Sequence, residues 1–275
     1  MSLTDRHSTD KAFAGSIPEL YDTCLVPLIF EPYAVDLASR VVSKGPKKVL
    51  EVAAGTGVLT RALSTALPDS TALVATDLNQ PMLDRARTVG ACRHVEWRQA
   101  DAMQLPFADG QFDVVVCQFG VMFFPDKPGA FAEARRVLSP GGTFIFNVWD
   151  RIEENAFALV VTDALARLYP ATPPRFLART PHGYHDRETI GRDLRLGGFL
   201  AEPAFETVAS HSRADSARIP SVAYCQGTPL RNELEALGPA ELARATDVCT
   251  AAMAGKFGPG RVDGKIQAHV VTVEA

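Results

Sequence analysis

The sequence has few features of a membrane protein, a disulfide scaffold or a nucleic-acid-binding protein. No apolar run approaches the roughly 20 residues that cross a bilayer, and the polar Met1–Lys11 does not predict a signal peptide. The five cysteines are scattered and form no CxxC pair, so neither a disulfide framework nor a structural zinc site is expected. The 28 basic and 32 acidic residues give a net charge of −4 without basic clusters. We therefore expect a cytoplasmic protein that acts on a small molecule, without nucleic acid, metal or a membrane span.

What the chain does have is enough apolar residues for a large core. Over 275 positions, 47% of the residues are hydrophobic and 22% are charged. From Lys47 to Trp149, short apolar runs alternate with longer amphipathic stretches, which is typical of a parallel sheet covered by helices on both faces. Strands are expected at 48–52, 72–77, 94–99, 112–117 and 143–149, with a turn at 139–142 and helices that start after 57, 79 and 126.

The remaining segments add two strands and several helices. Prolines at 18, 27 and 32 divide Ile17–Val42 into two or three expected short helices. Downstream, strands are expected at 205–210 and 266–273, and helices at 155–169, 187–196, 230–237 and 239–254. The predicted fold class is α/β, a doubly wound and mostly parallel seven-stranded sheet. Within one overall domain, residues 1–46 form a helical cap or lid, 47–150 the ligand-binding core, and 151–275 complete the sheet with helical insertions.

A turn of small residues leads from the first predicted strand directly into a helix. Ala53, Gly55 and Gly57 lack bulk, so the backbone can approach a ligand closely at the helix N-terminus. Glu51 ends the strand, where a carboxylate would repel a pyrophosphate and attract a cationic ligand. This turn therefore predicts a ligand that carries positive charge.

Two further acids end the next two strands. Asp77, at the end of the second strand, is placed to accept both hydroxyls of a ribose. Asp101 follows the third strand and can accept a hydrogen bond from an amine such as that of adenine. Because the carboxyl ends of parallel strands share one edge of the sheet, Glu51, Asp77 and Asp101 together predict a site for a positively charged adenosine.

With Asp113 and the Arg136–Gly142 segment, these residues resemble class I S-adenosylmethionine-dependent methyltransferases of the ubiquinone/menaquinone-biosynthesis-like branch, methyltransferase type 11. The resemblance covers about Lys47–Trp149 and implies the Rossmann-like methyltransferase fold. It implies in-line transfer of a methyl group from S-adenosyl-L-methionine to a small-molecule acceptor, which leaves S-adenosyl-L-homocysteine. The family usually has glycine where Ala53 stands.

The resemblance also implies which residues hold the cofactor. The methionine part would face Glu51 and the turn, the ribose Asp77, and the adenosine its neighbours on the second and third strands. The implied cofactor residues are Glu51, Ala53, Ala54, Gly55, Gly57, Asp77, Leu78, Met82, Asp101, Ala102, Gln118 and Phe119. Tyr21 has two interpretations, a lid over the methionine carboxylate, as in similar proteins, or packing on the sheet edge.

The acceptor pocket is expected to form from the upstream helices and two insertions, Asp150–Tyr184 and Arg213–Arg261. Met122 and Phe123 are candidates for an apolar wall of this pocket or for simple cover of the sheet. Tyr184 and His185 are candidates for its lining. They have two interpretations, a general base for the reaction or residues of a solvent-exposed loop. The sequence identifies no catalytic residue, and it does not fix the acceptor or the oligomeric state.

Two alternatives stay open. One is a nicotinamide-dinucleotide-dependent oxidoreductase, although Thr60 stands where its fingerprint needs a third glycine. The other is a non-catalytic cofactor-binding subunit that requires a partner chain.

Overall fold

The chain forms two compact units, and the computed structural model describes residues 10, 13 and 15–275. Most of the polar Met1–Lys11 stretch therefore lies outside the described residues. The sheet unit comprises Glu31–Val148, Tyr184–Val208 and Ala268–Ala275. The helical unit comprises the described part of Met1–Phe30 together with Trp149–Gly183 and Ala209–Gln267. The predicted division into 1–46, 47–150 and 151–275 stays a prediction.

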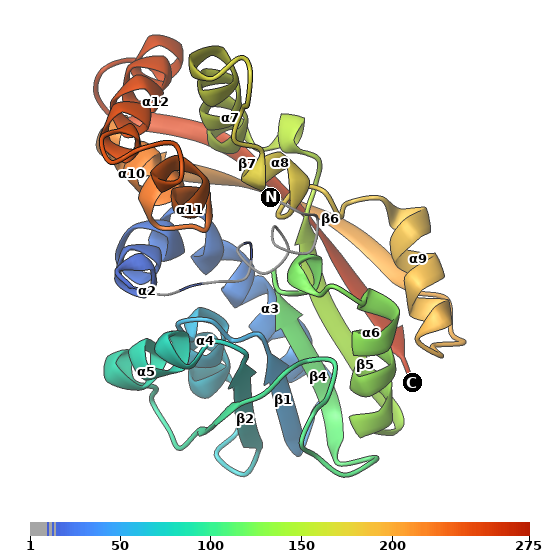
Figure 1. Ribbon diagram of the computed structural model, residues 1–275. Helices are drawn as coiled ribbons and strands as arrows, with labels where there is room; N and C mark the ends of the chain where they lie inside the picture. Colours follow the sequence, from blue (N-terminus) through green and yellow to red (C-terminus); the bar gives the residue numbers. More distant parts are fainter. Residues whose placement is uncertain (1–9, 11–12, 14) are drawn as a thin grey trace. The chain divides into compact units, whose positions relative to one another are not determined.

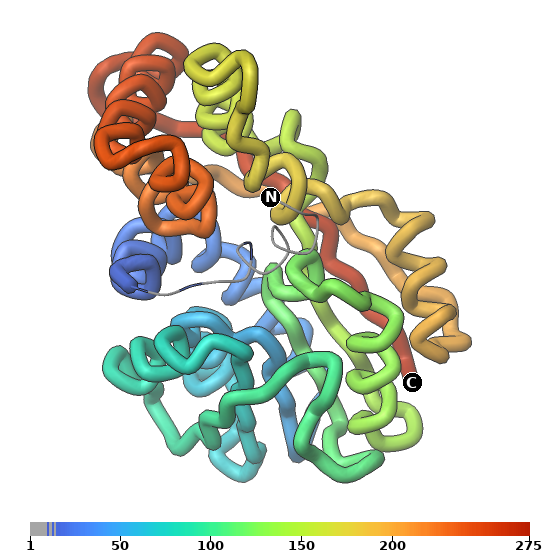
Figure 2. The backbone as a smooth tube through the Cα atoms, in the orientation of Figure 1, coloured from blue at the N-terminus to red at the C-terminus, as the bar shows by residue number. Residues whose placement is uncertain are grey.

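The sheet has seven strands in the order β3-β2-β1-β4-β5-β7-β6, and Figures 1 and 2 show β2, β1 and β4 side by side. All pairs from β3 to β5 are parallel, whereas β7 is antiparallel to β5, since Ala275 donates to Gly142 and Asp150 to Gln267. This confirms the predicted mostly parallel sheet. The order reverses between β1 and β4, where doubly wound sheets bind their ligands. The strands are β1 Lys48–Val52, β2 Ala72–Asp77, β3 Glu96–Gln99, β4 Phe112–Gln118, β5 Leu138–Trp149, β6 Ala204–Ala214 and β7 Val262–Glu274.

Helices pack on both faces of this sheet because its strands are apolar on both sides. One face of β4 and β5, including Val116 and Ile145, packs in a cluster with Leu37 of α3 and Leu59 of α4. The alternate residues of β5 point to the opposite face, where Phe131 of α6 lies against Phe144 and Phe146. The helices of this unit are α3 Glu31–Ser43, α4 Val58–Ala66, α5 Gln80–Val89, α6 Lys127–Val137 and α9 Arg187–Leu196.

The turn predicted at 139–142 is part of β5 instead of preceding it. The structure starts β5 at Leu138, which pairs with Phe112, while Thr143 pairs with Val114. Five positions on β5 thus oppose two on β4, and the extra residues form an irregularity in the ladder. The residues keep their turn chemistry, but the strand resumes on the same partner, so one longer strand results.

The helical unit departs from the sequence prediction at Pro27 and at residues 176–179 and 218–226, where unpredicted helices form. Tyr21–Phe30 forms η1, a π-helix that continues through Pro27, although proline was expected to end a helix there. The ring of proline clashes with the i−4 carbonyl of an α-helix, and the wider π-turn relieves this contact. Helix α10 was not predicted. The elements of the unit besides η1 are α2 Ile17–Leu20, η3 Ile152–Glu154, α7 Ala156–Leu168, α8 Phe176–Arg179, α10 Arg218–Gln226, α11 Leu230–Glu235 and α12 Glu241–Phe257.

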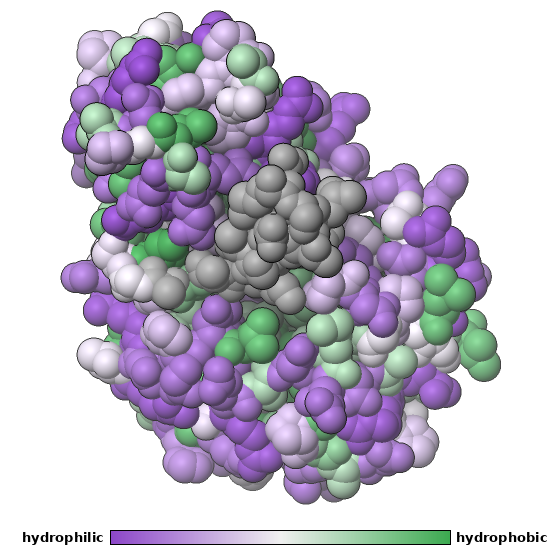
Figure 3. All heavy atoms as spheres, in the orientation of Figure 1, coloured by the Kyte–Doolittle hydropathy of each residue, from purple (hydrophilic) through white to green (hydrophobic). Residues whose placement is uncertain are grey.

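The surface is mostly hydrophilic on the face shown in Figure 3, and hydrophobic residues gather over α9. Leu196 and Leu200, at and after the end of α9, are 68% and 88% exposed. Within the described residues no helix is both long and apolar enough to cross a membrane, and no cluster of three or more metal-ligating side chains occurs.

Candidate functional site

The turn after β1 brings backbone to the carboxyl edge of the sheet unit. Ala53, Gly55 and Gly57 have φ angles of 55°, 57° and 83°, in the left-handed region. At Gly57, a Cβ would lie 2.9 Å from the Trp97 ring, so this position requires glycine. Ala53 adopts the same region with a Cβ, which costs about 1–2 kcal/mol. The backbone is therefore as tightly turned as close approach to a ligand requires.

Four polar side chains lie on one face of the sheet, two at the carboxyl ends of β2 and β4 and two near the carboxyl ends of β1 and β5. Glu51 on β1 pairs with Ala75 on β2 and with Val116 on β4. These two partners stand two positions before Asp77 and Gln118. Gln118 in turn pairs with Asn147 on β5. Because side chains alternate along a strand, these four point to the same face. We call them the polar row, and each is at most 9% exposed.

Asp77 is held in place by backbone donors on both sides. Its Oδ2 accepts from the N–H of Gly55 at 2.8 Å, and its Oδ1 accepts from the N–H of Asn79 at 2.7 Å. The Asn79 side chain makes no capping hydrogen bond at the start of α5 and instead donates to Asp77 at 3.4 Å. Burial raises the pKa of Asp77. The carboxyl group is thus oriented before any ligand binds, and Oδ2 keeps a lone pair for a hydroxyl donor.

Glu51 is the most deeply buried acid of the polar row. Its exposed fraction is 1%, and its Oε2 accepts from the Thr60 hydroxyl at 2.5 Å. Burial raises its pKa to about 8, a shift that the Thr60 hydrogen bond and the Arg61 charge partly oppose. Glu51 is therefore mostly protonated at pH 7, and its carboxylate forms readily only when positive charge arrives nearby.

Asn147 is a residue that the sequence analysis missed. Its Oδ1 accepts from the N–H of Phe119 at 2.8 Å, which fixes the orientation of the amide. The Nδ2 group is fully buried and donates to none of the described residues. A buried donor without an acceptor costs about 1–3 kcal/mol. A polar side chain in the otherwise apolar run Phe144–Trp149 was the available signal.

The predicted adenosine side lies around the ends of β2 and β3. Met82 and Ala102 are buried, whereas Leu78 is 43% exposed, so its side chain is free to cover a ligand. Asp101 is half-buried, and its Oδ1 accepts from the N–H of Met103 at 2.9 Å. This contact shapes the turn after β3 and leaves the second carboxyl oxygen for a ligand.

The segment after β4 continues the site beyond Gln118. Phe119 has a φ of 49°, and its ring packs edge-on against Tyr33 with centroids 5.2 Å apart. Met122 is buried and Phe123 half-buried in the short helix η2 (Val121–Phe123). A strained non-glycine residue directly after Gln118 indicates that the chain is forced into a sharp turn at this edge.

Two other predicted family residues act on the fold rather than at this edge. The Oδ2 of Asp113, at the amino end of β4, accepts from the N–H groups of Lys47 and Lys48 as the chain enters β1. Arg136 donates to the carbonyl groups of Leu105 and Phe107. Both residues fix connections on which the strand order depends.

Comparison with known proteins identifies the family. The sequence profile of the methyltransferase-domain family matches residues 50–146, which include the whole turn after β1. The chain is 31% identical over 184 residues to the ubiquinone/menaquinone biosynthesis C-methyltransferase UbiE of Saccharophagus degradans. The aligned region covers 62% of this chain and 73% of that protein. This chain belongs to the UbiE-like class I S-adenosylmethionine-dependent methyltransferases. The predicted resemblance is confirmed.

Other relatives agree on this methyltransferase family and on the fold. The chain is 40% identical over 139 residues to the demethylmenaquinone methyltransferase of Thermus thermophilus, half of this chain and 61% of that protein. The match thus spans about three fifths of the length of that relative. The fold resembles that of the YcgJ protein of Bacillus subtilis, with a TM-score of 0.56 and 16% identity, over 88% of this chain and 98% of that protein. It also resembles that of the [4+2]-cyclase SpnF (TM-score 0.52, 19% identity, 89% and 80% covered).

The dinucleotide alternative is not favoured for this UbiE-like methyltransferase. The side chain of Thr60, which stands where the dinucleotide fingerprint needs glycine, donates to Glu51 within the polar row. Family membership and this contact therefore point the same way.

The candidate acceptor residues of the methyltransferase lie in different surroundings. The Tyr184 hydroxyl donates to Asp193 of α9 at 2.9 Å, and Lys127 lies 4.7 Å from the centre of its ring. Burial raises the pKa of Tyr184 further above its ordinary value. His185 is half-buried beside it. Tyr184 is thus a fixed hydrogen-bond donor, and its part in an acceptor pocket stays a prediction.

Tyr21 belongs to the helical unit. Its ring stacks on Phe30 with centroids 5.1 Å apart and meets Phe13 edge-on at 5.9 Å. It therefore belongs to an aromatic cluster of the N-terminal segment. Its role as a lid stays a prediction.

The raised pKa of Glu51 has a measurable effect on stability. Between pH 4.5 and about 8 the unfolded chain loses the Glu51 proton while the folded chain keeps it. The free energy of unfolding should therefore fall as the pH rises through this window, by at most about 1.4 kcal/mol per pH unit. Urea unfolding at several pH values should show this fall in the wild type and a flatter curve for Glu51→Gln.

The matched control for this measurement is Glu202→Gln, because Glu202 is exposed. This variant should follow the wild-type curve. Parallel curves for Glu51→Gln and the wild type would show that Glu51 ionises normally in the folded protein.

Proposed function

We propose that this chain transfers the methyl group of S-adenosyl-L-methionine to a small-molecule acceptor at the carboxyl edge of the sheet unit. The observation that carries the proposal is the polar row at the strand-order reversal, three of whose four residues lie within the segment that the methyltransferase-domain family matches. The chemistry of these residues suits the cofactor, since buried carboxyl groups can meet hydroxyl donors and a cation.

The proposed cofactor contacts follow from the local geometry. Asp77 would accept hydrogen bonds from the ribose hydroxyls, because backbone donors already orient its carboxyl group. The backbone of the turn from Ala53 to Gly57 would lie along the methionine part. Leu78 and Met82 would cover the adenine, and Asp101 would accept from its amine. The cofactor, when bound, supplies an activated methyl group, so the protein needs to bind, align and exclude water.

Gln118, Phe119 and Asn147 would form the side of the site that faces the acceptor. The Nδ2 group of Asn147 is a fixed and unused donor one strand beyond Gln118. We assign it to an oxygen of the acceptor, such as a carbonyl, phenolate or carboxylate oxygen. No residue is assigned as a general base. A cytoplasmic location and an acceptor pocket built from the upstream helices and both insertions also remain proposals.

Transfer of an isotopically labelled methyl group tests the proposed function. The purified protein is incubated with methyl-labelled S-adenosyl-L-methionine and a metabolite extract, and the products are separated by mass. We expect label in a small molecule and formation of S-adenosyl-L-homocysteine in equal amount. Cofactor binding without label in any extract would favour the non-catalytic subunit, and binding of nicotinamide dinucleotides alone would favour the oxidoreductase.

If Asn147 contacts the acceptor, its replacement should reduce methyl transfer without weakening cofactor binding. Asn147→Asp keeps the acceptor for the Phe119 N–H but replaces the Nδ2 donor by an oxygen. We expect methyl transfer to fall roughly 10-fold to 100-fold, the effect of about 1.4–2.8 kcal/mol from one lost hydrogen bond to a charged or buried group. Cofactor affinity, measured by calorimetry, should stay within about twofold. Equal loss of both properties would place Asn147 at the cofactor instead.

A further inference from the structure

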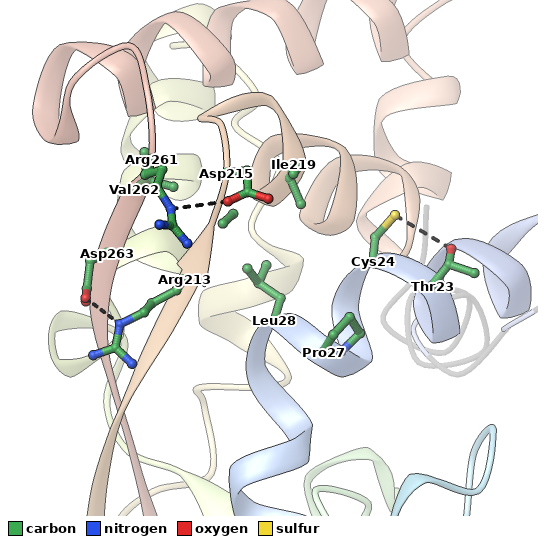
Figure 4. A pocket seen from close by; sticks show the side chains of 11 residues that line it. Thr23, Cys24, Pro27, Leu28, Arg213, Asp215, Ile219, Arg261, Val262 and Asp263 are labelled. Carbon is green, nitrogen blue, oxygen red and sulfur yellow. Dashed lines mark hydrogen bonds and ion pairs between the residues drawn. The ribbon is translucent and has the colours of Figure 1, made fainter.

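The helical unit contains a cavity whose lining includes none of the individual residues named above for the cofactor or the acceptor. Its volume is about 650 Å³, which is in the range of sites that hold small organic ligands. Figure 4 shows two walls, one from η1 with Pro27 and Leu28, and one from the ends of β6 and β7 with Arg213 and Arg261. The hydroxyl of the buried Ser212 on β6 donates to the Leu28 carbonyl at 2.8 Å, which joins the two walls.

One side of this cavity is apolar and is built on an unusual helix. Pro27, Leu28, Ile219 and Val262 supply aliphatic surface to its lining. The first two belong to the π-helix η1, and π-helical segments occur frequently at functional sites. A ligand in this cavity would therefore need an apolar body.

The other side presents guanidinium groups held by neighbouring strands. The Nε of Arg213 donates to Asp263 at 2.7 Å, and the Nε of Arg261 lies 3.2 Å from Asp215. Arg213 lies on β6 and Asp263 on β7, while Asp215 directly follows β6 and Arg261 directly precedes β7, and all four residues line the cavity. The terminal amino groups of both arginines donate to none of the described residues.

These ion pairs contribute little to stability. The side chains of Arg213 and Asp263 are 68% and 48% exposed, and those of Arg261 and Asp215 are 87% and 83% exposed. Exposed pairs of this kind stabilise a fold only slightly. The pairs do orient two planar donor groups, and the arginine fork matches the two oxygens of a carboxylate.

We propose that this cavity binds a small carboxylic acid whose apolar body lies on η1 and whose carboxylate meets Arg213 and Arg261. The site lies wholly within the helical unit, so the proposal does not depend on methyl transfer. Its ligand differs in class from the cofactor, because the cavity offers hydrogen-bond donors beside an aliphatic wall.

The thiol of Cys24 provides a direct measurement because it lines the cavity and is half-exposed. Alkylation of Cys24 by N-ethylmaleimide, followed by peptide mass spectrometry, is measured without cofactor in the presence of octanoate. At a concentration ten times its dissociation constant, octanoate should slow alkylation roughly tenfold. Octan-1-ol, which has the same apolar body without the acid, should protect far less. Cys92 is exposed in the sheet unit and should react at an unchanged rate.

Paired variants test the guanidinium groups. Arg213→Gln combined with Arg261→Gln should abolish protection of Cys24 by octanoate. Arg218→Gln should retain it, since Arg218 is likewise exposed and ion-paired, to Asp247 at 2.9 Å, but does not line the cavity. Full protection in the double variant, equal protection by octan-1-ol, slowing of Cys92, or no effect of millimolar octanoate on wild-type Cys24 would each overturn the proposal.

Discussion

Replacing Asp77 by alanine is expected to weaken binding of S-adenosyl-L-methionine by about 5-fold to 150-fold. This range corresponds to about 1–3 kcal/mol, the effect of losing charge-assisted hydrogen bonds to two ribose hydroxyls. The change also removes the acceptor for the N–H groups of Gly55 and Asn79, so the turn should become less stable. Isothermal calorimetry below the unfolding temperature of the variant, which is measured first, gives the affinity of the folded protein.

Two controls separate the ribose contact from other effects of Asp77. Asp84→Ala removes an exposed acid of α5 that accepts from Gln80, and it should leave cofactor affinity unchanged. S-Adenosyl-L-homocysteine has the same ribose but no sulfonium charge. Asp77→Ala should weaken both ligands equally if the hydroxyls are the partners. Loss confined to S-adenosyl-L-methionine would show a charge effect instead, and unchanged affinity would remove Asp77 from the site.

Replacing Gly120 by alanine is expected to destabilise the protein by about 2–3 kcal/mol, the usual effect of overpacking. A Cβ at this position would lie 2.5 Å from the Cβ of Ala53 and 2.6 Å from the Sγ of Cys117. The Cβ of Ala53 cannot rotate away, because it is attached directly to the backbone of the turn. Urea unfolding should show the loss, and cofactor affinity should fall because the turn is displaced.

The proposed clash can be relieved from its other side. Ala53→Gly removes the Cβ that Gly120→Ala would strike, so the double variant should recover part of the lost stability. Ala53→Gly alone should change stability by less than about 1 kcal/mol, because relief of left-handed strain is offset by added chain entropy. Gly255→Ala in α12 meets nothing within 4 Å and should raise stability by about 0.5–1 kcal/mol. Additive effects at 53 and 120 would contradict the contact.

The coupling also explains a departure from the family pattern. The family usually has glycine where Ala53 stands, and the sequence alone suggested only a tighter turn. In the structure the extra methyl group lies against Gly120, one residue after the strained Phe119. The alanine is compatible with the fold because position 120, on another strand end, has no side chain.

The core of the sheet unit was predictable because its signals are local. Leu59 and Leu63 recur at helical spacing and are both fully buried, and Asp126 caps α6 by accepting from the Gly129 N–H. The chain order of the parallel strands then placed Glu51 and Asp77 at one edge. Periodicity, caps and topology were sufficient for this part.

The features that were missed depend on contacts between distant segments. The amide of Asn147 is oriented by the N–H of Phe119, which is 28 residues away in the sequence and directly follows the neighbouring strand β4. Pro140 and its neighbours were expected to form a turn before the fifth strand, but β5 already pairs with β4 at Leu138 and the ladder resumes beyond them. Helix α10 contains Pro220 near its start, which obscured the helical pattern. Periodicity along the chain does not reveal such partners.

The burial of Glu51 has a consequence for the two forms of the proposed cofactor. If the sulfonium of the bound cofactor lay beside Glu51, its positive charge would favour the carboxylate, and the uncharged sulfur of the product would let the side chain take up a proton. S-Adenosyl-L-homocysteine would then lie beside a neutral Glu51 side chain, whereas S-adenosyl-L-methionine would lie beside its carboxylate. Discrimination between reactant and product would therefore sharpen in alkaline solution and fade in acid, where product inhibition would be strongest.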